Sequence, residues 1–136
     1  MNAKTIKNIL ISYIKATSNE VRIYQEKSIG NSICDVMAVT NRLIGYEIKS
    51  DLDNYTRLQE QVKSYTAFFD ENYLVVGERH IHSAAERVPD SWGILCVTES
   101  DISLVRKATT NTSVSRRKQL SILWKLELKN LLVKNE

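Results

Sequence analysis

The run Tyr73-Leu-Val-Val-Gly77 constrains the fold of this chain more than any other stretch. It is continuously apolar, so a strand formed here carries apolar side chains on both of its faces. Strands of this kind are typical of parallel sheets, in which a helix crosses over between one strand and the next. The run therefore predicts an α/β fold with helices covering both sides of a sheet.

The residues before this run supply a helix and three strands. Apolar side chains recur at helical spacing from about Ala3 to Ala16. Three strand-like runs follow at 21–27, 32–40 and 42–49, and short polar connections separate them. Connections of that length predict an antiparallel meander, because parallel neighbours need a long crossover.

A second helix lies between the meander and the apolar run. Asp51 or Asp53 can cap its start, and it extends to about Phe69. Its apolar stripe, which we expect to face the sheet, consists of Leu58, Val62, Tyr65 and Phe69. The element order through the apolar run is then αβββαβ.

Further elements extend this core toward the C-terminus. The sequence predicts a short helix at 81–87, a buried strand at 93–97 and an edge strand at 102–106. A linker-like stretch at 108–115 precedes a last helix. The residues expected on the apolar face of that helix are Leu120, Leu123, Trp124, Leu128 and Leu131. We therefore expect an α/β protein of three layers, α/β/α, in which a central mixed sheet carries the αβββαβ core plus the C-terminal helix.

The composition fits one ordered domain spanning residues 1–136. Hydrophobic residues make up 43% and charged residues 26%, and the formal charge of +3 is too small to identify a partner by itself. Cys34 and Cys96 lie in apolar runs, so we expect buried, reduced thiols rather than a disulfide or a metal site. Since the sequence shows no leader pattern and no apolar run long enough to span a bilayer, we expect a cytoplasmic protein without membrane contact.

Two carboxylates are expected to face each other in the second hairpin. A turn centred on Asn41 pairs Asp35 with Glu47 across that hairpin, with their Cβ atoms about 5 Å apart. Opposed carboxylates repel, so a chain selected only for stability avoids this arrangement unless a positive group lies between them. The pair therefore predicts a bound divalent cation. The alternative is a hairpin edge at which both carboxylates reach solvent.

The neighbouring groups specify the cation and suggest its chemistry. Asp35, Glu47 and the main-chain carbonyl of Ile48 supply hard oxygen ligands for Mg²⁺, for which Mn²⁺ can substitute. Lys49 lies one pleat further along the same face of the strand. Its ammonium group can orient or deprotonate an attacking water and offset charge that develops on a phosphoryl group.

Other side chains are expected to reach the same place. A turn in the preceding connection puts Glu26 beside Asp35, as a third carboxylate. Gln61 lies one turn before Tyr65 on the face of the second helix that meets the sheet, so an amide and a phenol approach from above. The alternative for Gln61 is a polar residue at the rim of the helix interface.

A basic cluster and a tryptophan have two interpretations each. Arg116, Arg117 and Lys118 open the last helix, where positive charge is unfavourable with the helix dipole. A nucleic-acid phosphate nearby would explain them, and the alternative is a hydrated basic turn beside the linker. Trp92 either packs in the core or stacks on a base.

These features resemble the signature of the PD-(D/E)XK nuclease superfamily, whose core has the order αβββαβ. The resemblance is closest to a small single-domain bacterial and phage branch related to the MmcB-like DNA repair proteins, and it spans most of the chain. The positions that carry it are Glu26, Asp35, Glu47, Ile48, Lys49, Ser50, Asp53, Arg57, Leu58, Gln61, Tyr65, the Tyr73 strand and the segment 123–127.

The resemblance implies a Mg²⁺-dependent phosphodiesterase that acts on nucleic acid, as an endo- or exonuclease. We expect DNA more than RNA as the substrate, in a repair or phage and defence context. The roles implied are metal ligation by Asp35 and Glu47, catalysis by Lys49, an auxiliary acid at Glu26 and a helper at Gln61. We also expect Arg57 and Tyr65 to contact nucleic acid.

Two other classes of function stay open from the sequence. One is a module with the nuclease fold that binds nucleic acid or a partner protein with little or no cleavage. The other is a structural or inhibitory phage-type protein that uses the exposed face of the last helix as its interface. A homodimer and a separate partner protein are both compatible with the sequence.

Overall fold

The computed structural model describes residues 1–99 and 101–134, with side chains through Lys129. The elements are α1 (Ala3–Thr17), β1 (Arg22–Ile29), β2 (Ser32–Val39), β3 (Leu43–Lys49), α2 (Leu58–Phe68), β4 (Glu71–Gly77), η1 (Glu78–His80), α3 (Ile81–Arg87), β5 (Gly93–Thr98), β6 (Asp101–Arg106) and α4 (Arg116–Lys134). The α/β class and the αβββαβ order that the sequence predicted are confirmed.

The strands form one mixed sheet in the order β1-β2-β3-β4-β5-β6. The pairs β1–β2 and β2–β3 are antiparallel, as expected for a meander. The pairs β3–β4 and β4–β5 are parallel, and β6 returns antiparallel to β5. Each parallel step contains a helix, α2 before β4 and α3 before β5, because a parallel pair needs a crossover.

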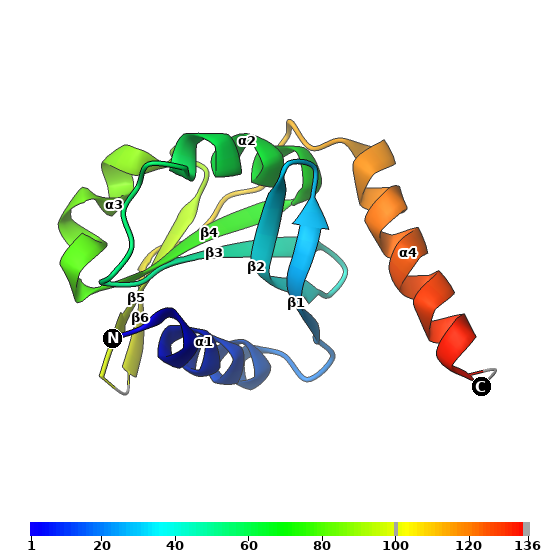
Figure 1. Ribbon diagram of the computed structural model, residues 1–136, viewed down its shortest axis with the longest axis horizontal. Helices are drawn as coiled ribbons and strands as arrows, with labels where there is room; N and C mark the ends of the chain where they lie inside the picture. Colours follow the sequence, from blue (N-terminus) through cyan, green and yellow to red (C-terminus); the bar gives the residue numbers. More distant parts are fainter. Residues whose placement is uncertain (100, 135–136) are drawn as a thin grey trace.

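Helices cover both faces of the sheet (Figure 1). The apolar stripe of α1, formed by Ile6, Leu10 and Ile14, packs on one face. The helices α2 and α3 cover the other face. In β4, Val75 packs in the core under α1, whereas Leu74 and Val76 pack in the core under α2 and α3. This division explains why the apolar run is continuous and confirms the three-layer arrangement.

The second helix begins later than the sequence predicted. It starts at Leu58, and neither Asp51 nor Asp53 caps it. Asp53 instead closes a tight turn, since its Oδ2 accepts hydrogen bonds from the backbone N of Ser50 at 2.8 Å and from the Ser50 hydroxyl at 2.9 Å. The residues between β3 and α2 therefore form an ordered loop. The predicted inward stripe is otherwise correct, because Leu58, Tyr65 and Phe69 are fully buried.

The predicted apolar face of the last helix is wrong for the side chains that the structure describes. Leu120, Leu123, Trp124 and Leu128 are exposed, while Ile122 and Leu126 pack on the core that α2 covers. The side chain of Leu131 lies outside the described residues. Helix α4 extends beside the sheet at its β1 end (Figure 1), so it is only partly covered by the rest of the molecule.

Three smaller expectations concern buried groups and membranes. Cys34 and Cys96 are buried and free, as predicted. Trp92 is 1% exposed, which excludes stacking on a base and confirms packing in the core. Within the described ranges, no helix has the length and apolar character needed to cross a bilayer.

Candidate active site

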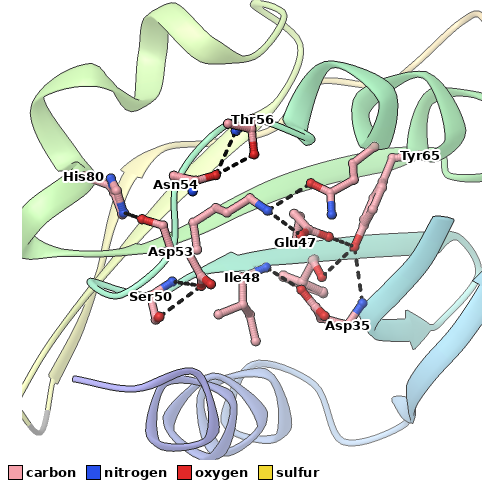
Figure 2. Close-up of polar contacts among 12 residues, drawn as sticks. Asp35, Glu47, Ile48, Ser50, Asp53, Asn54, Thr56, Tyr65 and His80 are labelled. Carbon is pink, nitrogen blue, oxygen red and sulfur yellow. Dashed lines mark hydrogen bonds and ion pairs between the residues drawn. The ribbon is translucent and has the colours of Figure 1, made fainter.

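The hairpin register that brings the two carboxylates together is as predicted. Val36 pairs with Tyr46 and Met37 with Gly45, which continues to Asp35 and Glu47. The ladder between β2 and β3 ends at this point, and Asp35 turns toward β3 instead. Its Oδ2 accepts a hydrogen bond of 2.8 Å from the backbone N of Ile48 (Figure 2). Asp35 thus lies where β2 separates from β3.

A break in the side-chain alternation of β2 accompanies this separation. Cys34 and Met37 belong to the core under α2, whereas Val36 belongs to the core under α1. Residues two apart in a regular strand share a face, so Cys34 and Val36 would have pointed the same way. The strand is therefore twisted at Asp35, and this irregularity places a carboxylate beside a backbone N–H of the next strand.

Glu47 and Lys49 lie on the face of β3 that meets α2. The Lys49 Nζ is 3.3 Å from Glu47 Oε1 and donates a hydrogen bond of 2.9 Å to Gln61 Oε1. Both charged residues are nearly fully buried, with exposed fractions of 2% for Glu47 and 6% for Lys49. Gln61 therefore fixes the lysine, as the amide of a helper residue should.

Tyr65 holds the other side of this cluster. Its hydroxyl donates a 2.6 Å hydrogen bond to Glu47 Oε2 and accepts one of 3.2 Å from the backbone N of Asp35 (Figure 2). The side chain is fully buried, so the predicted contact between Tyr65 and nucleic acid is corrected. Its place indicates that it positions the carboxylates instead.

Burial and mutual repulsion determine the charges in the cluster. Burial, followed by the negative charge of Asp35, raises the pKa of Glu47 from 4.5 to about 7, although Tyr65 and Lys49 act against the shift. Burial also raises the pKa of Asp35, opposed mainly by the Ile48 N–H. The two groups resist being ionised together, which is the condition under which a cation binds favourably.

The first hairpin also has the predicted register, but its carboxylate points elsewhere. Gln25 pairs with Val36 and Lys27 with Cys34, which leaves Glu26 opposite Asp35 without a ladder pairing of its own. The Glu26 side chain forms an ion pair with Lys7 of α1 and is 57% exposed. It therefore lies beside the carboxylate pair and is not joined to it.

The cluster forms the floor of a cleft of about 730 Å³ between α1 and α2. Asp35, Glu47, Ile48, Lys49 and Gln61 line it, together with Glu26, Asp53 and Arg57. Lys4, Lys7 and Asn8 of α1 line the opposite wall, and sequence reasoning missed them. Their helical spacing places them on one side of α1, but it does not predict a site, because polar residues on the outer face of a helix are usually solvated.

The basic cluster at the start of α4 is not part of this cleft. Arg116 bonds to Asp70 Oδ1 at 2.9 Å and to Gln119, and Lys118 lies over the Phe68 ring. Phe68 and Asp70 are at the C-terminal end of α2, whereas the cleft is at its N-terminal end. None of Arg116, Arg117 and Lys118 lines the cleft, so the structure separates them from the other predicted site residues.

The donor atoms fit a hard divalent cation in chemistry but form only part of a shell. Asp35 and Glu47 supply two carboxylates, and Ile48, whose main-chain carbonyl is the third predicted ligand, lines the same cleft. No group of three or more His, Cys, Asp or Glu side chains arranged to hold a metal occurs among the residues that the structure describes. A Mg²⁺ ion that keeps several waters is compatible with such a sparse set.

The fold and this cluster define an α/β protein with a buried carboxylate and lysine site in a cleft between its helical layers. The chain belongs to the family described as Bacteriophage P4 protein cII, whose family model matches residues 1–136. A curated relative, protein cII of Enterobacteria phage P4, is 24% identical over 140 residues. That alignment covers 97% of this chain and 53% of the relative, so the chain spans about half of the relative's length.

Two solved structures are similar to this chain. SPO1766, a protein of unknown function from Silicibacter pomeroyi, aligns with a TM-score of 0.62 at 16% identity, covering 90% of this chain and 84% of that protein. This similarity supports the fold alone. SfsA from Pyrococcus furiosus, solved in complex with Ca²⁺, aligns at 16% identity over 82% of this chain and 63% of that protein. Its TM-score is 0.42, too low to support an argument.

Proposed function

We propose that this chain is a Mg²⁺-dependent nuclease of the PD-(D/E)XK type that hydrolyses phosphodiester bonds in DNA. One observation carries the proposal: Asp35, Glu47 and Lys49 meet at the floor of an open cleft, although the two carboxylates repel each other and burial raises the pKa of both. Buried charges that a fold does not need for stability are candidates for function. A purely structural role gives no reason for two carboxylates to share this place.

The residues divide the chemistry between them. When bound, Mg²⁺ supplies a Lewis acid for the phosphoryl oxygens and lowers the pKa of a coordinated water. Asp35 and Glu47 would hold the ion, and Tyr65 and the Ile48 N–H keep their carboxylates in place. Lys49, fixed by Gln61, offsets negative charge as it builds up on the reacting phosphate.

The walls of the cleft suit a polyanion. Lys4 and Lys7 lie on the α1 side, and Arg57 lies on the α2 side. Basic side chains on both walls would bind phosphates on either side of the bond to be cut, independently of base sequence. The curated relative is about twice as long as this chain. The proposed activity therefore does not include a preference for a DNA sequence or a DNA structure.

A cleavage assay tests the proposal. Labelled single-stranded, duplex and branched DNA, and RNA, are incubated with Mg²⁺ and either the wild type or Lys49→Ala. We expect cleavage of DNA by the wild type and a loss of at least about 100-fold in Lys49→Ala, the usual scale for a group acting on the reacting atoms. Lys63→Ala, which removes an exposed lysine of α2, is the control and should cut normally.

The assay also separates the alternatives. DNA binding without cleavage by the wild type would favour a binding module that carries the nuclease fold. Neither binding nor cleavage would favour a structural protein.

A further inference from the structure

The ion pair between Lys7 and Glu26 lies at the solvent-exposed edge of the cleft. Lys7 comes from α1 and Glu26 from β1, and both line the wall beside Asp35. The Lys7 side chain is only 19% exposed, and its ammonium group pairs with Glu26 on this wall of the cleft. Its positive charge is close enough to Asp35 to favour the ionised carboxylate, while Glu26 disfavours it.

The backbone of Glu26 is in an unusual conformation. Its φ of 55° lies in the left-handed region, and no other non-glycine residue in the described part of the chain has a positive φ. A side chain with a Cβ adopts this region at a cost, and such residues concentrate at sites where the strain has a purpose. Regular strand geometry at this position would have given Glu26 a ladder pairing with Asp35, as its neighbours have with theirs.

The pair that holds Glu26 is weak for its position. Glu26 is more than half exposed, so water competes for both charges and the ion pair contributes little to stability. Glu26 is therefore held in a strained conformation by a partner that is easily exchanged. Its charge lies next to Asp35, one of the two carboxylates that would take up a cation, and a cation there would attract a third carboxylate.

We propose that Lys7 is a phosphate-binding residue of the cleft that Glu26 neutralises in the metal-free protein and releases when a divalent cation binds at Asp35 and Glu47. This inference rests on the nuclease function proposed above. Release leaves the Lys7 ammonium free to pair with a phosphate of the nucleic-acid strand on the α1 wall, opposite Arg57. Cation binding and strand binding are then coupled, and each strengthens the other by the same factor.

Binding titrations test the role of Lys7 without any cleavage. A fluorescent DNA duplex is titrated with protein, and anisotropy is followed either in EDTA or with Ca²⁺, which takes the same oxygen ligands as Mg²⁺. With Ca²⁺ we expect Lys7→Ala to bind about fivefold more weakly than the wild type, and the slope of log K against log salt to fall by about one phosphate contact. In EDTA the wild type and Lys7→Ala should bind the duplex with nearly equal affinity, because the Lys7 ammonium is already paired with Glu26.

The variant Glu26→Gln tests the release. It keeps the shape of the side chain and removes the charge that holds Lys7, so in EDTA it should bind the duplex about fivefold more tightly than the wild type. Calorimetry with Ca²⁺ alone should show weaker cation binding by Glu26→Gln. Lys15→Ala, which removes an exposed lysine in the last turn of the same helix, is the matched control and should change neither quantity.

Two results would overturn the inference, and they are distinguishable. If the wild type binds the duplex with Ca²⁺ while Lys7→Ala and Glu26→Gln behave like Lys15→Ala, the inference fails and the proposed nuclease function stands. If the wild type binds neither Ca²⁺ nor DNA, both fail together.

Discussion

At the scale of residues, the site is defined by charges that oppose each other. Glu47 is almost fully buried beside Asp35, and the Lys49 ammonium is 3.3 Å from its Oε1. Burial of such a group lowers stability unless it is neutralised by a proton, an ion pair or a metal. Because burial raises the pKa of Glu47 to about 7, we expect a proton to neutralise this carboxylate in part. A divalent cation would displace that proton.

The raised pKa predicts how stability depends on pH. The unfolded chain releases the Glu47 proton near pH 4.5, and the folded metal-free protein holds it until about pH 7. The folded state therefore binds more protons between these values, so the free energy of unfolding falls as the pH rises, by up to roughly 3 kcal/mol. We predict that Glu47→Gln removes most of this fall, so the variant matches the wild type near pH 5 and is more stable at pH 8.

Urea denaturation in EDTA at several pH values between 5 and 8 measures this difference. Glu60→Gln, at the exposed rim of the same cleft, is the control and should follow the wild-type pH dependence. A difference between Glu47→Gln and the wild type that does not change with pH would contradict the account.

Tyr65 gives a second prediction at this scale. Tyr65→Phe removes the donor to Glu47 and leaves the backbone N–H of Asp35 without its acceptor. A buried polar group without a hydrogen-bond partner has a desolvation cost that nothing offsets. We therefore expect the free energy of unfolding to fall by about 1–3 kcal/mol. Tyr13→Phe, on a partly buried tyrosine of α1, should cost less than about 0.5 kcal/mol. Equal losses in the two variants would mean that the Tyr65 hydroxyl does not hold the cluster.

The sequence reaches some residues of the site and not others for a physical reason. Asp35, Glu47 and Lys49 follow from strand alternation and a short turn, which fix the register over a few residues. Gln61 follows from helical spacing. Lys7 is distant along the chain from all of these, and only the packing of α1 brings it to Asp35. The left-handed backbone of Glu26 could not be predicted from the sequence, because glycine is the residue that usually adopts this conformation.

At the scale of elements, β3 and α2 meet closely because Gly45 has no side chain. A Cβ at Gly45 would lie 2.4 Å from Cδ2 of the fully buried Phe69 ring. We predict that Gly45→Ala destabilises the fold by about 1–3 kcal/mol through overpacking, measured by thermal or urea denaturation. Adding Phe69→Leu should recover part of the loss if the ring is the obstacle. A neutral Gly45→Ala variant would contradict this contact.

Helix α4 carries apolar side chains on two sides, and this explains why its inner face was mistaken. A stripe that includes Leu120 matches helical spacing as well as the stripe formed by Ile122 and Leu126, so periodicity could not choose between them. We predict that Leu126→Ala costs about 2–4 kcal/mol in the free energy of unfolding, whereas Leu120→Ala, at 66% exposure, costs less than about 0.5 kcal/mol. A larger loss for Leu120→Ala than for Leu126→Ala would support the inner face that the sequence predicted.

At the scale of the whole molecule, the order of the strands was more predictable than the limits of the helices. The apolar run in β4 required cover on both faces, and short or long connections then fixed antiparallel or parallel pairing. The first residue of α2 was harder to predict from the sequence, because an aspartate such as Asp53 can either cap a helix or close a turn. In the structure its hydrogen bonds to Ser50 close a turn.

The layered architecture also accounts for the place of the cleft. The helices α1 and α2 lie on opposite faces of the sheet, and β2 separates from β3 at Asp35. The separation lets residues from both helical layers line one opening, as Lys7 and Gln61 do. A strand of nucleic acid lying there would contact both layers at once.

A calorimetric titration of Mg²⁺ into the metal-free protein near pH 6.5 measures whether Asp35 and Glu47 bind a divalent cation. We predict saturable binding that releases protons, because a cation at these carboxylates displaces the proton held by a group with a pKa of about 7. Asp35→Asn should weaken this binding at least about tenfold. Absence of binding at millimolar Mg²⁺, or equal binding by Asp35→Asn, would contradict the assignment of the carboxylate pair as a metal site.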